Sequence, residues 1–261
     1  MRKVFIELII LIAAGVLLWI IFSKTVSIPE KPALISVEKE IEIGKRIKED
    51  LLQLNGFTTI SNRKIDSIFK NLSDTLELYL PDNQFKYNFI IVDSDIINAF
   101  AIPGGYIAIT KGLINYCNTN DELLAVIGHE IGHIENRHVI NRLIRDLGIS
   151  LLLSNDKYVG SEVAKMLFTQ SFNRKQEELA DSYSCTFLER LGLEPRTLAS
   201  FLRRLMEQDE NISDNFEIVS SHPSMTKRIR MILNYKESKI KNSKHFNFNF
   251  LKIIKQELNN V

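Results

Sequence analysis

The chain has 261 residues, of which 45% are hydrophobic and 25% are charged, and its formal net charge is +1. This is the composition of an ordinary globular protein with enough residues for one good core. A net charge this close to zero gives no support for a nucleic-acid partner or an acidic ligand. The two cysteines, Cys117 and Cys185, exclude a disulfide framework and a cysteine zinc cluster, which leaves one pair or two buried thiols.

The first 25 residues are far more apolar than the rest of the chain. Residues 4–22, VFIELIILIAAGVLLWIIF, contain a single charged residue, Glu7. As an α-helix this run is about 28 Å long, close to the thickness of the hydrocarbon core of a bilayer. A cleaved signal peptide is the alternative, but its apolar core is normally shorter, and no A-x-A cleavage site follows. We therefore predict an uncleaved transmembrane anchor that binds the lipid bilayer.

Basic residues on both sides of this run indicate its orientation. Arg2 and Lys3 precede it, and Lys24 and Lys31 follow it, so the positive-inside rule slightly favours a cytoplasmic N-terminus. The predicted location is a single-pass membrane protein with its folded domain outside the cytoplasm, in the periplasm if the source is bacterial. The predicted parts are a membrane anchor, a linker, a folded domain and a basic, aromatic tail, at residues 1–25, 26–35, 36–236 and 237–261.

Apolar spacing predicts a mainly helical domain with one small β-sheet, an α+β fold. The run 147–153, LGISLLL, is too short to span a membrane and is either buried core or the wall of an apolar cleft. Strands are predicted at 85–93 and at 98–110, which Pro103-Gly104-Gly105 divides in two. Helices are predicted from 36 to about 54, from about 61 to 80, from a cap at Thr119 through His138 and beyond, from about 161 to 191, from Pro195 to about 208, and over 226–235, and the tail is compatible with an amphipathic helix.

The stretch VIGHEIGHIENRH, residues 126–138, contains three of the five histidines of the chain. Residues i and i+4 of a helix lie on one face, so His129 and His133 can both direct an imidazole nitrogen to one metal ion. Glu130 follows the first histidine and can reach a water molecule bound to that metal. This is the H-E-x-x-H arrangement, for which zinc is the expected ion and the glutamate is the expected general base.

The alternative interpretation of this stretch is an amphipathic helix with solvated histidines. Gly128 and Gly132 argue against it, because each costs about 1 kcal/mol relative to alanine in a helix. A solvated helix gains nothing from this cost. Close approach of another helix or of a substrate would explain both glycines.

A catalytic zinc ion needs a third protein ligand and an open fourth position. A metzincin has glycine and histidine where this chain has Asn136 and Val139, so that class is excluded. The candidate ligand is Glu177, and Asp181, one turn later, can accept a hydrogen bond from a ligand histidine. Glu178 competes as a ligand but points about 100° away from Glu177. A charged, solvated helix face is the alternative for all three acidic residues.

Four blocks of the sequence resemble the zinc metallopeptidases of peptidase family M48, which includes HtpX-like and type 1 CAAX prenyl protease-like enzymes. The resemblance covers residues 36 to about 235 and is closest to single-span or periplasmic quality-control members. It implies a zincin-type metallopeptidase domain built around an active-site helix. The blocks are NAFAIPGGYIAITKGLI, ELLAVIGHEIGHIENRH, NRKQEELAD and SHPSMTKRI, at 98–114, 122–138, 173–181 and 221–229.

The resemblance also implies roles for individual residues. It makes Glu130 the general base and Asp181 the carboxylate that orients a ligand histidine. Asn173 stands where the family usually has serine, which does not affect the ligands. The implied ligands of one Zn²⁺ ion per chain are His129, His133 and Glu177.

Two further histidines, His222 and His138, are not predicted to be among these three ligands. By resemblance, His222 lies near the metal and acts in catalysis by stabilising the oxyanion, or closes the fourth zinc position in a resting state; the alternative is a surface-loop histidine. His138 is five residues from His133, too far for a shared helix face, so it either contacts a ligand or is solvated.

The block 98–110 predicts where a substrate would lie. An exposed edge strand beside a zinc site can hold an extended peptide by adding it to the sheet, so that many sequences fit. The alternative is a plain hairpin in the core. The predicted substrate contacts are Asn98, Ala99 and Phe100.

The predicted function is that of a zinc-dependent metalloendopeptidase that cleaves misfolded or misassembled envelope or membrane proteins with a zinc-activated water. The substrates are polypeptides, and no nucleic acid is involved. A prenyl-protein protease is disfavoured, because that activity goes with several membrane spans and this chain has one. The second hypothesis is a zinc-stabilised chaperone-like or protein-binding module with little proteolytic activity, for which Glu130 would be unnecessary.

Overall fold

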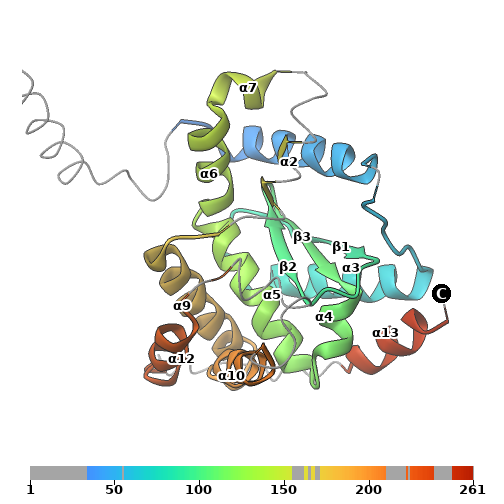
Figure 1. Cartoon of the computed structure of the whole chain (residues 1–261), viewed down its shortest axis with the longest axis vertical. Coiled ribbons are helices and arrows are strands. Elements are labelled where there is room, and N and C mark those ends of the chain that lie inside the picture. The colour runs from blue at the N-terminus through green and yellow to red at the C-terminus, as the bar shows by residue number, and fades with distance from the viewer. Residues whose placement is uncertain are drawn as a thin grey trace, which may run out of the picture. The chain divides into compact units, whose positions relative to one another are not determined.

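A three-stranded sheet lies among the helices of the described chain (Figure 1). Strands β1 (Asn88–Val92), β2 (Ala99–Ile102) and β3 (Tyr106–Thr110) lie in the order β1-β3-β2. β1 is parallel to β3, and β2 is antiparallel to it. The β2–β3 turn contains Gly104 and Gly105, whose φ angles of 78° and 93° lie in the region that favours glycine. The two short strands predicted from 98–110 are confirmed.

The structure is a computed structural model that describes residues 34–54, 56–154, 162–163, 166–167, 171–209, 222, 224–237 and 249–260. No helix within these described ranges is long and apolar enough to cross a membrane. The predicted anchor at residues 1–25 lies outside them. Residues 33–261 cluster as one unit, to which all of the described residues belong.

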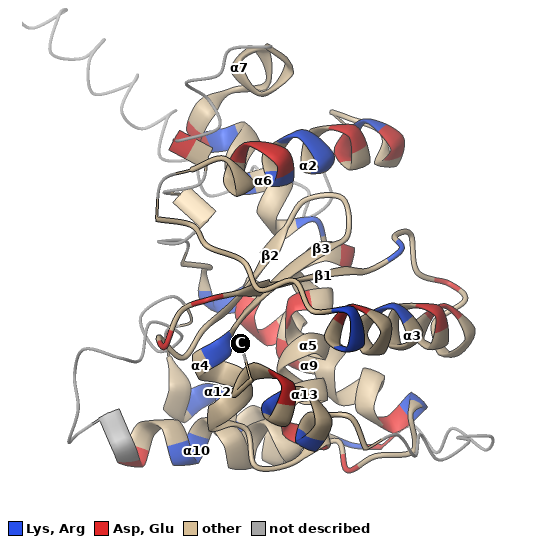
Figure 2. Cartoon of the chain, turned by 90° about the vertical axis from the view of Figure 1, so that its right-hand side faces the viewer, with Lys and Arg blue, Asp and Glu red and all other residues tan. Residues whose placement is uncertain are grey.

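Helices make up most of the described chain, so the prediction of a mainly helical fold with a small sheet is confirmed. Along α2 and α3, Lys and Arg positions are interspersed with Asp and Glu positions (Figure 2). The helices are α2 (Val37–Leu52), α3 (Arg63–Tyr79), α4 (Lys111–Tyr116), α5 (Asn120–Glu135), α6 (His138–Leu147), α7 (Ile149–Leu153), α9 (Arg174–Arg190), α10 (Thr197–Asp209), α12 (Met225–Leu233) and α13 (Leu251–Leu258).

Helix α5 lies between the sheet and α9, and it contacts both (Figure 1). Two glycines allow α9 to come this close. A Cβ atom on Gly132 would lie 2.8 Å from Ala180 Cα, and one on Gly128 would lie 2.5 Å from the Phe187 ring. Any larger residue at either position would push the helices apart. The prediction that close helix packing explains the glycines is confirmed.

The predicted helix through His138 and beyond is wrong at one point. Helix α5 ends at Glu135, and Arg137 adopts a left-handed conformation with φ 57° before α6 begins. Two side-chain contacts, one within α5 and one to a distant helix, stabilise this break. The side chain of Asn136 donates to the Gly132 carbonyl at 2.9 Å, and Arg137 Nε donates to the buried Glu40 carboxylate at 2.7 Å. Sequence periodicity cannot detect a break that depends on a partner 97 residues away.

The predicted helix from about 161 to 191 is interrupted, because residues 162, 163, 166 and 167 are helical but the residues just before Arg174 are not. Helix α9 begins at Arg174, after Asn173, whose side chain and that of Gln176 form a reciprocal capping box. Asn173 and the serine that it replaces are both preferred N-cap residues, which explains why this departure is harmless. Ser171 and Phe172, which precede the cap, are not helical.

The tail forms a helix that packs on the body of the domain. Helix α13 contacts α3 and α4, and Phe250, which precedes it, is 0% exposed. Asn120 Oδ1, at the start of α5, accepts hydrogen bonds from the backbone N–H groups of Phe250 and Leu251. The tail therefore belongs to the folded unit.

The short run at 147–153 matches neither predicted alternative completely. Leu152 is buried, whereas Leu151 and Leu153 of α7 are 39% and 43% exposed.

The two cysteines, Cys117 and Cys185, are both buried and free, so the interpretation as two buried thiols is the one observed.

Candidate metal centre

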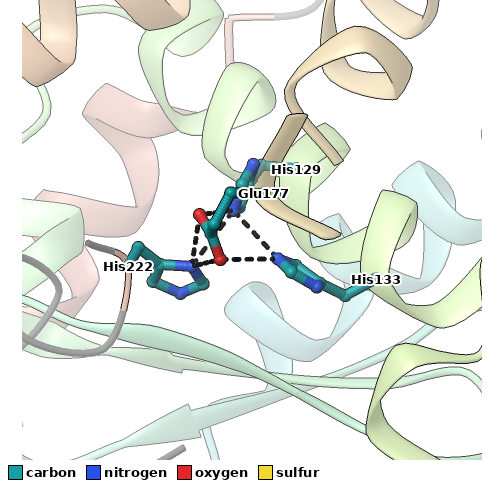
Figure 3. A group of neighbouring side chains, drawn as sticks. All are labelled: His129, His133, Glu177 and His222. Carbon is teal, nitrogen blue, oxygen red and sulfur yellow. Dashed lines mark hydrogen bonds and ion pairs between the residues drawn. The ribbon is translucent and has the colours of Figure 1, made fainter. Parts of the chain in front are cut away.

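Four side chains from distant parts of the chain converge at the end of the α5–α9 contact (Figure 3). His129 and His133 lie one turn apart on α5, Glu177 lies on α9, and His222 precedes α12. One ligand atom from each of them lies within 4.8 Å of all the others. All four side chains are buried, with exposed fractions of 3% or less.

The spacing of these atoms fits one tetrahedral metal ion. His129 Nε2 lies 3.1 Å from His133 Nε2 and 3.2 Å from His222 Nδ1. Glu177 Oε1 lies 3.5 Å from His133 Nε2 and 3.0 Å from His222 Nδ1. Four ligands bonded to one zinc ion at about 2.0–2.1 Å are separated from each other by about 3.3 Å. The described donor set therefore has the size and chemistry to hold one metal ion.

Hydrogen bonds orient both metal-facing histidines. Asp181 Oδ1 lies 2.9 Å from His129 Nδ1, and His138 Nδ1 lies 3.0 Å from His133 Nδ1. When the two α5 histidines donate from Nδ1, each keeps the Nε2 lone pair free for a metal. The break between α5 and α6 is what brings His138 to this position, and because it is 0% exposed, the solvated alternative is wrong.

Phe172 completes the surroundings of His133. Its ring stacks on the imidazole with a centroid distance of 3.8 Å and an interplanar angle of 24°. The ring is 3% exposed, so it also keeps water away from this side of the histidine.

The Glu130 carboxylate is buried beside the cluster. It is 0% exposed, and neither of its oxygens has a hydrogen-bond partner among the described residues. His222 Nε2 lies 3.6 Å from Glu130 Oε1, and this nitrogen also lacks a hydrogen-bond partner among the described residues. Burial raises the pKa of Glu130 to about 7, although the nearby His222 acts in the opposite direction. A buried carboxylate without partners is costly and indicates a place for chemistry.

Burial and nearby charges favour, at His129, His133 and Glu177, the protonation states that a metal would require. Burial lowers the pKa of His129 and of His133, which favours the neutral imidazole. Burial acts to raise the pKa of Glu177, but the charges of His222 and Arg228 keep it below its ordinary value. Burial is outweighed in the same way at Asp181, whose pKa is lowered by Arg228.

The charges of the centre also fit a divalent ion. The carboxylates of Glu177 and Asp181 share a single guanidinium, that of Arg228, and all three residues are buried. When the histidines are neutral, these groups leave one negative charge at the centre, and ionisation of Glu130, whose pKa is raised to about 7, adds a second. A buried net charge of this size is unfavourable unless a cation neutralises it.

The structure brings together most of the residues that the sequence singled out. Glu178 is exposed, as its direction on the helix predicted, so it is no rival to Glu177. Arg228 was missed, although it lies in one of the four blocks, because an isolated arginine on a helix is normally solvated. Phe172 was missed because aromatic side chains are ordinary core residues.

The three candidate substrate contacts lie on or next to β2, an edge strand of the described sheet. The Ala101 backbone on this strand lies near enough to the Glu130 carboxylate to lower its pKa, although it does not meet the geometry of a hydrogen bond, so β2 lies beside the carboxylate. The expected exposure of the strand is not found: Asn98, Ala99 and Phe100 are only 3%, 1% and 2% exposed. This burial matches the alternative that the sequence left open, a plain hairpin in the core.

A helix that presents two histidines and a glutamate, joined by a carboxylate from a second helix, defines a metallopeptidase type of centre. A family model confirms this class: peptidase family M48 matches residues 59–236, more than half of the chain. The chain belongs to this family, as the four sequence blocks indicated.

Several curated relatives share the matched region. The Beta-barrel assembly-enhancing protease of Escherichia coli (strain K12) is 27% identical over 215 residues, which cover 75% of this chain and 43% of that protein. The Metalloprotease LoiP of the same organism is 30% identical over 156 residues, with 56% and 61% covered. The Mitochondrial metalloendopeptidase OMA1 of Arabidopsis thaliana is 28% identical over 152 residues, with 56% and 31% covered. The chain thus spans less than two thirds of each of these relatives.

Proposed function

We propose that this protein is a zinc metalloendopeptidase. The observation that carries the proposal is the buried Glu130 carboxylate, which lies without hydrogen-bond partners among the described residues, next to the four-residue cluster. A metal site that only stabilised the fold would have no use for such a group. A general base requires one, because it must be free to accept a proton.

In this proposal His129, His133 and Glu177 hold Zn²⁺. The metal, when bound, supplies the Lewis acidity that makes a water molecule nucleophilic at neutral pH and polarises the scissile carbonyl. Glu130 accepts the proton of the attacking water and delivers it to the amine that leaves. Asp181 keeps His129 in the tautomer with Nδ1 protonated, and burial keeps bulk water from Glu130.

His222 stands where a fourth ligand would stand. Its Nδ1 is within 3.2 Å of both His129 Nε2 and Glu177 Oε1. This arrangement supports the role of closing the fourth metal position in a resting state. Rotation away from the ligands would leave the same imidazole beside the reacting carbonyl, where it could stabilise the oxyanion.

The proposed substrates are polypeptides held in extended form against β2. Asn98 Oδ1 is buried and has no hydrogen-bond partner among the described residues, so it can accept an N–H group of a peptide. Because β2 is covered, a peptide must displace what lies on the strand. Misfolded or misassembled envelope proteins are the proposed substrates, in line with the name of the Beta-barrel assembly-enhancing protease. Residues 1–25 would anchor the protein in the membrane with its domain outside the cytoplasm.

The test is cleavage of unfolded casein by the chain from residue 26 onward, with Glu130→Gln beside the parent. We expect the variant to keep its bound metal and to lose cleavage by about 10²–10⁴-fold, the usual contribution of a positioned base. A matched control is Glu178→Gln, an exposed carboxylate that should change neither quantity. Equal cleavage by Glu130→Gln would contradict the proposal, and metal binding without cleavage by the parent would favour the chaperone-like alternative.

A further inference from the structure

Arg228 is the one basic side chain that reaches the metal-facing residues within the described part of the chain. It lies on α12 and is 2% exposed. Its guanidinium contacts the carboxylates of Asp181 and Glu177, the His222 carbonyl and the His129 imidazole. Burying a guanidinium is unfavourable unless its donors are used, so the directions of these contacts indicate what the residue does.

Asp181 receives two of these donors in a forked arrangement. Arg228 Nε donates to Oδ2 at 2.8 Å, and Nη2 donates to Oδ1 at 2.7 Å. A two-point contact of this kind fixes the plane of a carboxylate, which a lysine could not do. The fixed oxygen Oδ1 is also the atom that lies 2.9 Å from His129 Nδ1. The fork therefore sets the direction of the hydrogen bond that orients a metal-facing histidine.

Arg228 contacts only one of the two carboxylate oxygens of Glu177. Arg228 Nη1 lies 2.9 Å from Oε2, whereas Oε1 is the oxygen closer to His222 Nδ1, at 3.0 Å against 3.2 Å. With Oε2 held by the arginine, Oε1 is left to face the metal position. The same nitrogen donates to the His222 carbonyl at 3.3 Å, which ties the residue preceding α12 to the site.

We propose that Arg228 is a positioning residue of the metal centre, which turns Glu177 into a one-oxygen ligand and aligns Asp181 with His129. The inference rests on the proposed metal site. An ordinary structural ion pair between α9 and α12 would need only one of these carboxylates. Arg228 instead contacts both of them. It donates to Asp181 Oδ1, which also lies beside His129 Nδ1, and it contacts Glu177, the proposed metal ligand.

The experiment measures zinc affinity by competition with a chelator, on the chain from residue 26 onward. Arg228→Met removes the charge at similar length, and Arg228→Lys keeps the charge but not the fork. Arg230→Met is the matched control, since Arg230 lies on the same helix and is exposed. Visible absorption with Co²⁺ in place of zinc reports the ligand geometry directly, and circular dichroism confirms that each variant is folded.

We expect zinc binding to weaken by about tenfold to a hundredfold in Arg228→Met, the usual effect of removing a partner of the ligands. Arg228→Lys should recover only part of this loss, the Co²⁺ spectrum should change in both variants, and Arg230→Met should match the parent. Zinc affinity within about twofold of the parent, or tighter, in folded Arg228→Met overturns the inference. If that variant does not fold, parental affinity and spectrum in Arg228→Lys overturn it instead. Absence of zinc from the parent would instead contradict the proposed function.

Discussion

Both ends of helix α5 are rich in polar groups, but the hydrogen bonding of these groups differs between the two ends. At the N-terminal end, Thr119 Oγ1 accepts the N–H of Glu122, and the Glu122 carboxylate accepts from Arg204 Nη2 at 2.8 Å and from the Asn118 N–H at 2.7 Å. At the other end, both oxygens of Glu130 lack partners among the described residues. The polar groups at the N-terminal end therefore form a hydrogen-bonded network, whereas the Glu130 carboxylate has no such partners in the described part of the chain.

The difference separates stability from chemistry. A fully hydrogen-bonded network stabilises the fold and has nothing left with which to react. A buried group without partners lowers stability and persists because it is needed for something else. Substitutions at the N-terminal end should therefore change the free energy of unfolding alone, and substitutions at the metal-facing end should change metal binding or cleavage.

The largest effect on stability is expected from the tail that packs at the N-terminal end. Phe250→Ala removes a ring that is 0% exposed and should lower the free energy of unfolding by about 3–5 kcal/mol. Ile253→Ala, on the same helix but 42% exposed, should change it by no more than about 0.5 kcal/mol. Urea denaturation measures both values. A loss of zinc affinity in folded Phe250→Ala would break the proposed separation.

Gly132→Ala tests the metal-facing end. The added methyl group would lie 2.8 Å from Ala180 Cα, so α9 must shift, which should cost about 1–3 kcal/mol despite the helix propensity gained. Because Glu177 lies on α9, the shift should also weaken zinc binding. Thermal unfolding and chelator competition measure the two effects. Stabilisation of the protein by this substitution would show that the helices are not in contact as described.

The smallest effect is expected from Glu122→Gln, at about 1 kcal/mol near neutral pH. Burial acts to raise the pKa of Glu122, but Arg204 and the nearby N–H groups hold it below its ordinary value. A carboxyl with a lowered pKa stabilises the fold above its unfolded pKa of about 4.3, and this contribution is lost as the pH falls through the folded value. The difference in Tm between parent and variant should therefore be full near pH 6 and shrink towards pH 3. A difference that grew on acidification would contradict the ion pair.

Local sequence signals predicted much of this structure. The N-cap at Thr119, the hairpin at residues 98–110 and the convergence of His129 and His133 follow from spacing and turn chemistry alone. Glu177 could be proposed as the third ligand because helical geometry paired it with Asp181. Gly128 and Gly132 predicted a close neighbour, which is α9.

Features that depend on distant partners were not predictable. The break after Glu135 is stabilised in part by the contact of Arg137 with Glu40, and the break brings His138 to His133. The role of Arg228 depends on how α12 packs against α9, which no local pattern records. The burial of β2 likewise depends on which side chains cover the strand.

The most direct test of the account is the zinc content of the purified chain from residue 26 onward, measured with that of Glu177→Gln and Glu178→Gln. One zinc ion per chain is predicted in the parent and in Glu178→Gln, because Glu178 is exposed, and none is predicted to survive dialysis in Glu177→Gln. A folded parent without zinc, or undiminished zinc in Glu177→Gln, would contradict the central claim that these buried side chains form a metal centre.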